Sequence, residues 1–166
     1  MKAVVSTLAA GLLLAAATPV LATDFTWNGN TSAFWDEANW SVGPFGSQNY
    51  PGQNQSGDTA AIAVATNNPV ILDIGLPYEV KTVDLDADAA GANITLDIRT
   101  GADLDTSGLV TLKSDLDGSY EAKIIVGATF TPAVMRFWGR NHATSGHAKL
   151  DADVDFTVDN DLTVRQ

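Results

Sequence analysis

The chain contains no cysteine and is poor in basic residues and in glutamate. Without cysteine there is no disulfide framework, thiolate nucleophile or cysteine-based zinc site, so burial and backbone hydrogen bonds must hold the fold. Lys and Arg number 9 against 20 Asp and Glu, which gives a net charge of −11. This acidic balance argues against nucleic acid and anionic membranes as partners, because both require positive side chains to neutralise phosphate.

The sequence has a single long hydrophobic segment, which lies at its beginning. Lys2 precedes an apolar stretch over residues 3–17, and Val20-Leu21-Ala22 places small residues where signal peptidases prefer them. The pattern predicts a signal peptide over residues 1–22, cleaved after Ala22. A membrane anchor fits less well, because the stretch is short for a span and Pro19 interrupts its end. We therefore expect a protein that is secreted, either extracellular or at the cell surface, with no membrane-spanning segment in the mature chain.

The acidic residues are 17 aspartates and 3 glutamates. Aspartate is common in turns because its short side chain accepts hydrogen bonds from nearby backbone N–H groups, whereas glutamate favours helix interiors. The excess of aspartate therefore favours a turn-rich β protein. Aspartate is also a good calcium ligand, and composition does not distinguish these two uses.

Short segments that alternate apolar and polar residues fill the chain from residue 58 onward, with Gly or Asp-Gly turns between them. A period of two places alternate side chains on opposite faces of a strand, so Leu85 points inward and Asp84 and Asp86 point outward. The alternation continues through Ala87 and Asp88, and no segment predicts a helix. The predicted strands are 61–65, 70–74, 80–86, 94–99, 109–112, 122–126, 133–138, 150–158 and 162–164.

Two all-β architectures fit these strands. In a β-solenoid, each rung buries one face and bonds to the rungs above and below it. An antiparallel β-sandwich also uses short alternating strands with turns. Residues 95–105 have the order expected at a solenoid corner, namely a strand, a turn at Gly101 and then one inward leucine, Leu104. Periodicity alone does not decide between the solenoid and the sandwich.

Residues 23–58 form a segment rich in Asn, Gly, Ser and aromatic side chains. It holds three of the four tryptophans, Trp27, Trp35 and Trp40. These indoles either plug the open end of a core or stack on sugar rings. Burial is favoured, because exposed clusters of large apolar groups are uncommon on soluble monomers and buried aromatics contribute strongly to core energetics. The expected organisation is an aromatic N-terminal cap over 23–58 and solenoid rungs over 59–166.

The motifs of this segment occur in a distinctive order: Trp27-Asn28-Gly29, Trp35, Ala38-Asn39-Trp40, Pro51-Gly52 and Gly57-Asp58-Thr59-Ala60. With the strand pairs that follow, the order resembles the N-terminal part of secreted bacterial β-solenoid proteins, of the autotransporter-passenger type and of the similar type with a C-terminal sorting tail. The resemblance covers residues 25 to 112 well and the remainder loosely. It implies a right-handed parallel β-helix with a capped N-terminus and a non-enzymatic, adhesin-like or matrix-forming role.

Such proteins usually continue for hundreds of residues, so the resemblance also implies that this chain is the front part of a longer protein. If the chain instead stops at Gln166, its last strand is an edge open to self-association. A cell-surface glycan is the other partner that the resemblance and the aromatic residues suggest.

Residues 136–147 contain the most enzyme-like stretch, with both histidines, two arginines and one tryptophan. A carbohydrate-active β-helix, either a polysaccharide-lyase fragment or a glycan-binding domain, would use Trp138, Arg140 and His142 here. The alternative is a polar loop between two strands, with Phe137 and Trp138 facing the core. The loop is favoured, because the two histidines lack a usual metal-ligand spacing and no paired base is evident. The sequence therefore predicts no catalytic residue.

Calcium is the one cofactor for which the sequence offers candidate ligands. Residues 113–118 resemble a fragment of a calcium-binding loop but lack its first and last acidic ligands. The outward carboxylates of residues 84–88 are expected to meet Asp97 on a neighbouring rung about 4.8 Å away, where a cation would relieve their repulsion. Lys81 and Arg99 are alternative partners. The candidate calcium ligands are Asp84, Asp86, Asp97, Asp115 and Asp117.

Overall fold

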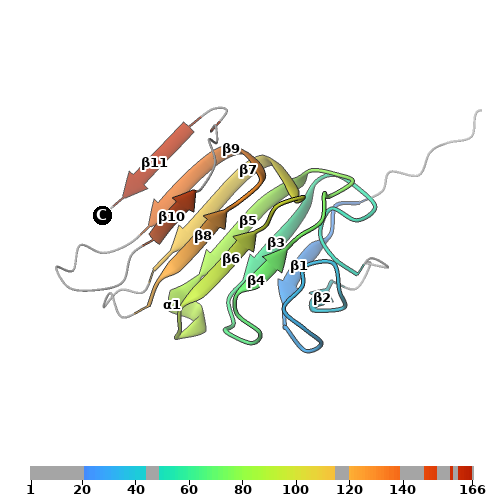
Figure 1. The fold of residues 1–166 in the computed structure, drawn as a ribbon, viewed down its shortest axis with the longest axis horizontal. Coiled ribbons are helices and arrows are strands. Elements are labelled where there is room, and N and C mark those ends of the chain that lie inside the picture. The colour runs from blue at the N-terminus through green and yellow to red at the C-terminus, as the bar shows by residue number, and fades with distance from the viewer. Residues whose placement is uncertain are drawn as a thin grey trace, which may run out of the picture.

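The computed structural model describes residues 21–43, 49–114, 120–138, 148–152, 158 and 161–165. This part of the chain is mostly β-strand and forms two sheets (Figure 1). The seven-stranded sheet has the order β11-β9-β7-β5-β3-β1-β2, and the four-stranded sheet has the order β10-β8-β6-β4. In the larger sheet the strands are β1 (Asp24–Trp27), β2 (Trp40–Val42), β3 (Asp58–Ile62), β5 (Val80–Asp86), β7 (Asp103–Lys113), β9 (Thr129–Trp138) and β11 (Asp161–Arg165). In the smaller sheet they are β4 (Val70–Leu72), β6 (Ile94–Ile98), β8 (Ala122–Val126) and β10 (Ala148–Ala152).

From β3 onward, successive strands alternate between the two sheets, so strands that are neighbours in a sheet are separated by a strand of the other sheet. Among the described strands, the ladder between β1 and β2 is antiparallel and all the others are parallel. Figure 1 shows the four-stranded sheet lying over the larger one. The described part of the chain is therefore mostly β, in agreement with the predicted class, and contains one short helix.

The hydrophobic core lies between the two sheets. Leu85 of β5 and Leu96 of β6 are both fully buried, whereas the alternate residues Asp84 and Asp97 are only partly buried. This confirms the inward and outward faces predicted from the period of two. The inward residues that are 0% exposed include Ile62, Leu72, Val83, Leu85, Ile94, Leu96, Ile98, Leu104, Val110, Leu112, Ile124 and Met135.

Helix α1 (Ala87–Ala90) occupies a place where the alternating pattern predicted more strand. Asp86 caps its start by accepting a hydrogen bond from the Ala89 N–H at 2.9 Å. Gly91 ends it in the left-handed conformation, at φ 60°. Three of the four helical residues are alanine, which has the highest helix propensity, so local preference and two caps override the alternation. Within the described residues, no helix is long and apolar enough to cross a membrane.

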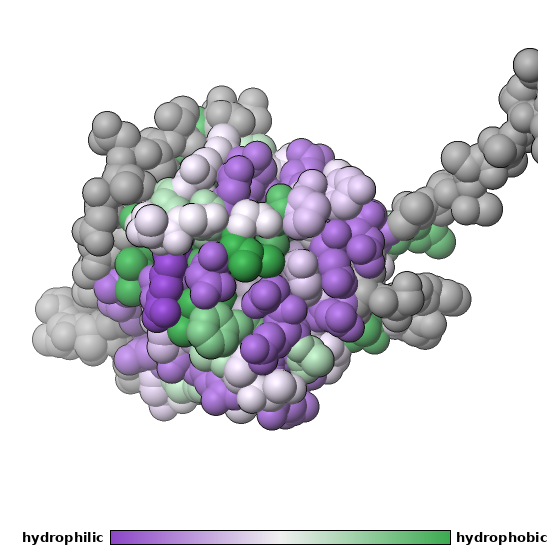
Figure 2. Space-filling model, turned by 45° about the vertical axis from the view of Figure 1, so that its right-hand side comes forward, coloured by the Kyte–Doolittle hydropathy of each residue, from purple (hydrophilic) through white to green (hydrophobic). Residues whose placement is uncertain are grey.

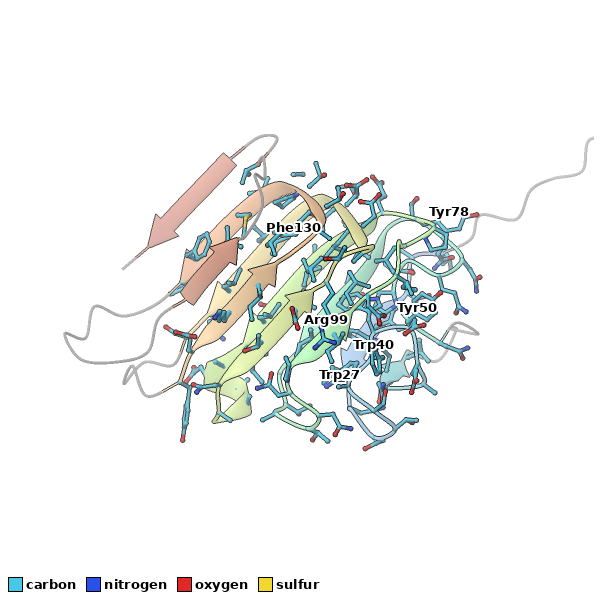
Figure 3. The ribbon with its side chains drawn as sticks, in the orientation of Figure 1. Trp27, Trp40, Tyr50, Tyr78, Arg99 and Phe130 are labelled. Atoms are coloured by element: carbon cyan, nitrogen blue, oxygen red, sulfur yellow. The ribbon has the colours of Figure 1, made fainter. Side chains whose placement is uncertain are left out.

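The three tryptophans of the N-terminal segment are buried, as predicted. Trp27, Trp35 and Trp40 are 1%, 0% and 6% exposed, and Trp40 meets the other two rings edge-on at centroid distances of 5.1 and 4.6 Å. Figure 3 shows Trp27 and Trp40 together beside β1. With their rings inside the core, these residues are not available for stacking on sugars. The predicted boundary of this segment falls at the first residue of β3, and β1 belongs to the same sheet as β3.

Each buried indole N–H donates to a backbone carbonyl and thereby ties a loop to the cluster. Trp27 donates to Thr66 O at 3.0 Å, Trp35 to Pro51 O at 3.2 Å, and Trp40 to Trp35 O at 2.7 Å. These bonds satisfy the polar end of each ring, which is the condition for burying tryptophan at low cost. Figure 2 shows that the surface around this end of the molecule is largely hydrophilic, with small hydrophobic areas between polar residues.

Asn39, directly before Trp40, is fully buried and organises the same region. Its side-chain oxygen accepts hydrogen bonds from the Thr31 and Ser32 N–H groups, both at 2.8 Å. Its amide donates to the Phe34 carbonyl at 2.8 Å and to the Ser32 hydroxyl at 3.1 Å. The asparagine of the Asn-Trp motif is therefore a structural residue that holds the loop around Trp35.

We expect Gly108→Ala to lower the free energy of unfolding by roughly 1–3 kcal/mol, the cost typical of inserting atoms into a packed site. A Cβ at Gly108 would lie 2.5 Å from the Lys81 carbonyl oxygen, where β7 approaches β5 at a register shift. Gly43→Ala is the matched control, because its Cβ has no described heavy atom within 4 Å. Chemical denaturation of both variants measures the difference, and equal stability of the two would contradict this account of Gly108.

Candidate functional site

The outer face of the seven-stranded sheet brings charged and aromatic side chains of β5, β7 and β9 together. Residues paired across neighbouring strands form register rows. In one outward row Thr111 lies between Asp84 and Arg136, and in the next outward row Lys113 lies between Asp86 and Trp138. All six belong to the outward set of their strands, because the alternate residues are in the core. We call Asp84, Asp86, Thr111, Lys113, Arg136 and Trp138 the outer-face cluster.

Asp86 and Lys113 form an ion pair across neighbouring strands. Lys113 Nζ lies 2.5 Å from Asp86 Oδ2. The hydrogen bond to Asp86 is the main cause that raises the pKa of Lys113, and the charges of Asp86, Asp84 and Asp88 act in the same direction against the opposing effect of burial. Lys113 therefore neutralises the charge of Asp86 on this face.

Asp84 is less well satisfied. Its Oδ1 is buried and has no hydrogen-bond partner in the described structure. Burial raises the pKa of Asp84 first and the charge of Asp86 raises it further, while Lys113 opposes them. Arg136 Nε, in the same register row, is also buried and has no hydrogen-bond partner among the described residues. Buried polar atoms are normally paired, so within the described structure this row carries one unsatisfied acceptor and one unsatisfied donor.

Trp138 contributes an exposed aromatic surface to the cluster. It is the last residue of β9, and 48% of it is exposed. Its carbonyl accepts a hydrogen bond from the Ser114 N–H at 2.9 Å, which fixes the end of the strand. The prediction that Phe137 and Trp138 both face the core is wrong for Trp138, because adjacent residues of a strand point to opposite faces and Phe137 packs against the core. Arg140 and His142, the other predicted glycan-binding residues, lie outside the described residues.

The structure separates Asp97 from the other candidate calcium ligands. Asp84 and Asp86 are on β5 of the larger sheet, whereas Asp97 is on β6 of the smaller sheet, so the expectation that they meet on neighbouring rungs is wrong. The error arose because consecutive strands belong to different sheets. Asp97 Oδ2 instead pairs with Arg99 Nε at 2.8 Å. Arg99 directly follows β6 and is labelled in Figure 3.

The Asp97–Arg99 pair lies in an open depression of 480 Å³ on the four-stranded sheet, lined by Asp73, Asp97, Ile98, Arg99, Thr100, Ile125 and Gly127. Across the described ranges, no group of three or more His, Cys, Asp or Glu could hold a metal ion. Asp115 and Asp117 lie outside these ranges, so their role as calcium ligands stays a prediction.

The chain matches no protein-family model, no curated protein and no solved structure. Its function is therefore inferred from its own residues. Sequence reasoning missed Thr111, Lys113 and Arg136, because their place beside Asp84, Asp86 and Trp138 depends on pairing between strands that are far apart in the sequence. The outward position of each residue was visible in the alternation, but the partner strand was not.

We expect Asp84→Asn to raise the free energy of unfolding at pH 7. Below its usual pKa of 3.8, Asp84 is protonated in the folded and the unfolded chain alike. As the pH rises from 3.8, burial and Asp86 oppose its ionisation in the folded chain, so stability is lost relative to the variant. The gain should therefore disappear in acid, which urea denaturation over a pH series measures.

The control for this experiment is Asp73→Asn, which removes the same charge from an exposed side chain. Its stability should stay within about 0.5 kcal/mol of the wild type at every pH. A pH-independent effect of Asp84→Asn, or a loss of stability at pH 7, would show that burial and Asp86 do not oppose the ionisation of Asp84.

Proposed function

We propose that the chain is a secreted, non-enzymatic β-solenoid module with a structural or adhesin-like role at the cell surface or in the extracellular matrix. The observation that carries this proposal is the strand alternation: each successive pair of strands adds one strand to each sheet, and the added strands pair in parallel with those before them. This is the connectivity of rungs stacked along one axis.

The inward residues support the proposal by their register. Val83 pairs with Val110 and Val110 pairs with Met135, so equivalent core positions follow one another along the larger sheet. These partners are about 25 residues apart, within the range of roughly 20–45 residues typical of solenoid repeats. In the smaller sheet, Leu96 pairs with Ile124 and Ile124 with Leu150 in the same manner.

The parallel ladders also favour the solenoid over the antiparallel β-sandwich, which requires neighbouring strands to run in opposite directions. The antiparallel pair is at the N-terminal end, where β2 is the last strand of the larger sheet. There the buried tryptophans close the core, as an N-terminal cap would. The right-handed form of the helix and the kinship with autotransporter passengers are part of the proposal, supported by the motifs of residues 25–112.

A deletion of one repeat tests the solenoid. Removing residues 111–135 joins Val110 to Arg136 and places Arg136 at the register position of Thr111, so both sheets keep their inward faces. A solenoid has mainly nearest-neighbour contacts, so we expect the shortened chain to fold and to unfold cooperatively at a lower urea concentration. Circular dichroism and urea denaturation measure both properties.

The matched control removes residues 111–134, one residue fewer. This deletion shifts Met135–Trp138 by one position and turns Met135 and Phe137 outward, so we expect it to destabilise the chain far more than the first deletion. If both deletions unfold the chain equally, the rungs do not behave as repeats and the solenoid proposal fails.

The outer-face cluster favours a second candidate function, glycan binding. An exposed indole lies within two register rows of the partly buried side chains of Asp84 and Arg136. A sugar ring has a face that can stack on an indole and hydroxyl groups that both donate and accept hydrogen bonds. This site uses Trp138, as the sequence suggested, but with Asp84 and Arg136 as its polar partners.

We expect Trp138→Ala to weaken binding to a neutral oligosaccharide by tenfold or more, equivalent to about 1.4 kcal/mol. Tyr78→Ala is the matched control, because Tyr78 is similarly exposed, at 46% against 48%, and lies outside the cluster. A glycan panel probed with and without calcium identifies the ligand. Absence of binding across the panel, or equal losses in the two variants, would remove the glycan-binding candidate and leave the structural role.

A further inference from the structure

A buried polar cluster holds the start of β1, and neither proposed function uses it. Thr23, Gln55 and Asp58 are 8%, 6% and 0% exposed, and we call them the N-terminal cluster. Asp58 Oδ1 accepts hydrogen bonds from the Thr23 backbone N–H at 3.0 Å and from Gln55 Nε2 at 2.8 Å. Asp58 Oδ2 accepts one from the Gly52 N–H at 3.0 Å.

The charge of Asp58 has no counterpart in the described structure. The ion pairs there are Arg99–Asp97 and Lys113–Asp86, and neither involves Asp58. A buried carboxylate is normally accompanied by a positive group, because taking an isolated charge out of water is costly. Three neutral N–H donors lower that cost but do not balance the charge.

Gln55 shows a second imbalance. Its Nε2 faces three acceptors, Leu21 O at 2.6 Å, Thr23 Oγ1 at 3.1 Å and Asp58 Oδ1 at 2.8 Å, although it has only two N–H groups. Its Oε1 is buried and has no hydrogen-bond partner within the described part of the chain. Exchanging the two amide atoms would not help, because the Leu21 carbonyl and the Asp58 carboxylate only accept. The cluster thus has one acceptor too many around Nε2 and lacks a donor for Oε1.

We propose that cleavage of the Ala22–Thr23 peptide bond completes this cluster, with the new α-ammonium group of Thr23 as the buried counter-charge of Asp58. A signal peptidase hydrolyses the bond with one water molecule: the hydroxyl joins the Ala22 carbonyl carbon, and the Thr23 nitrogen gains a proton from water and a second from solvent. Loss of Leu21 leaves two acceptors for the two N–H groups of Gln55 Nε2. The ammonium brings two more N–H donors to the cluster, one of which can serve Gln55 Oε1.

The β-ladder keeps the Thr23 nitrogen in place after cleavage. The Thr23 carbonyl accepts a hydrogen bond from the Thr59 N–H at 3.0 Å, and the Thr59 hydroxyl donates to Asp24 Oδ1 at 2.7 Å. Leu21 and Ala22, by contrast, are exposed, with Leu21 at 70%. The position of the nitrogen beside Asp58 therefore depends on β1 and β3 and not on the residues that precede it.

This inference rests on the secretory part of the proposed function and is independent of the solenoid. Its first test is the N-terminal residue of the secreted protein, after expression of the full chain with residues 1–22. Mass spectrometry should find a chain that begins at Thr23. Cleavage at any other bond would overturn the proposal without affecting the repeat-deletion test of the solenoid.

The second test measures the reactivity of the α-amine toward an amine-acylating reagent near neutral pH. The secreted chain is compared with a chain that begins at Ala22, whose amine sits on an exposed residue and whose Thr23 keeps an amide N–H. We expect the Thr23 amine to react at least tenfold more slowly than the Ala22 amine in the folded proteins and at the same rate in urea. Equal rates in the folded proteins would overturn the pairing, because a buried ammonium bound to a carboxylate is protected.

Stability provides the third readout, as a double comparison. The chain that begins at Thr23 should unfold at a higher urea concentration than the chain that begins at Ala22, and Asp58→Asn should abolish this difference. Asp73→Asn is the matched control, since it removes a charge from an exposed residue outside the cluster and should preserve the difference. If Asp58→Asn does not fold, the acylation rates of the wild-type chains still decide the outcome.

Discussion

Parallel pairing between strands that are two elements apart is the interaction on which the rest of the structure depends. Because β5 pairs with β7 and β6 pairs with β8, consecutive strands lie in alternate sheets. The apolar faces of the two sheets therefore meet in one core. The same pairing stacks equivalent outward residues in register rows. The outer-face cluster is therefore a consequence of the ladder: without it, Asp84, Thr111 and Arg136 would have no reason to lie side by side.

Such a ladder leaves the ends of the core open, and the N-terminal end is closed by the buried tryptophans. The indole N–H groups of Trp27 and Trp35 hold carbonyls of loops that are distant in sequence, and Asn39 holds the loop around Trp35. Asp58 belongs to the same end, at the first residue of β3. With the Thr23 ammonium as the proposed counter-charge of Asp58, removal of the leader completes the same end of the core that the tryptophans close. Asp84 differs from Asp58, because its carboxylate lies on the outer face and one of its oxygens has no hydrogen-bond partner in the described structure. Such a loss of stability is often found at binding sites.

The sequence was sufficient to predict most of the strands and their inward faces, because a period of two is a local property. Residues 94–98 and 122–126 form the strands expected from their alternation. The burial of the tryptophans was also predictable from their size and clustering. The places of Asp97 and Trp138 were not, because the first depends on which sheet a strand joins and the second on which residue of an apolar pair faces inward. Helix α1 was missed because its caps, Asp86 and Gly91, continue a pattern that also fits a strand and turn.

Disulfide formation between Thr95→Cys and Lys123→Cys tests the pairing most directly, since the chain has no other cysteine. The two residues are register partners on β6 and β8, at a spacing that a disulfide can bridge. The account predicts that this pair oxidises in the folded protein, whereas Thr95→Cys with Thr111→Cys does not, because β7 lies in the other sheet. Cross-linking of residues 95 and 111 without cross-linking of 95 and 123 would contradict the alternating parallel ladder.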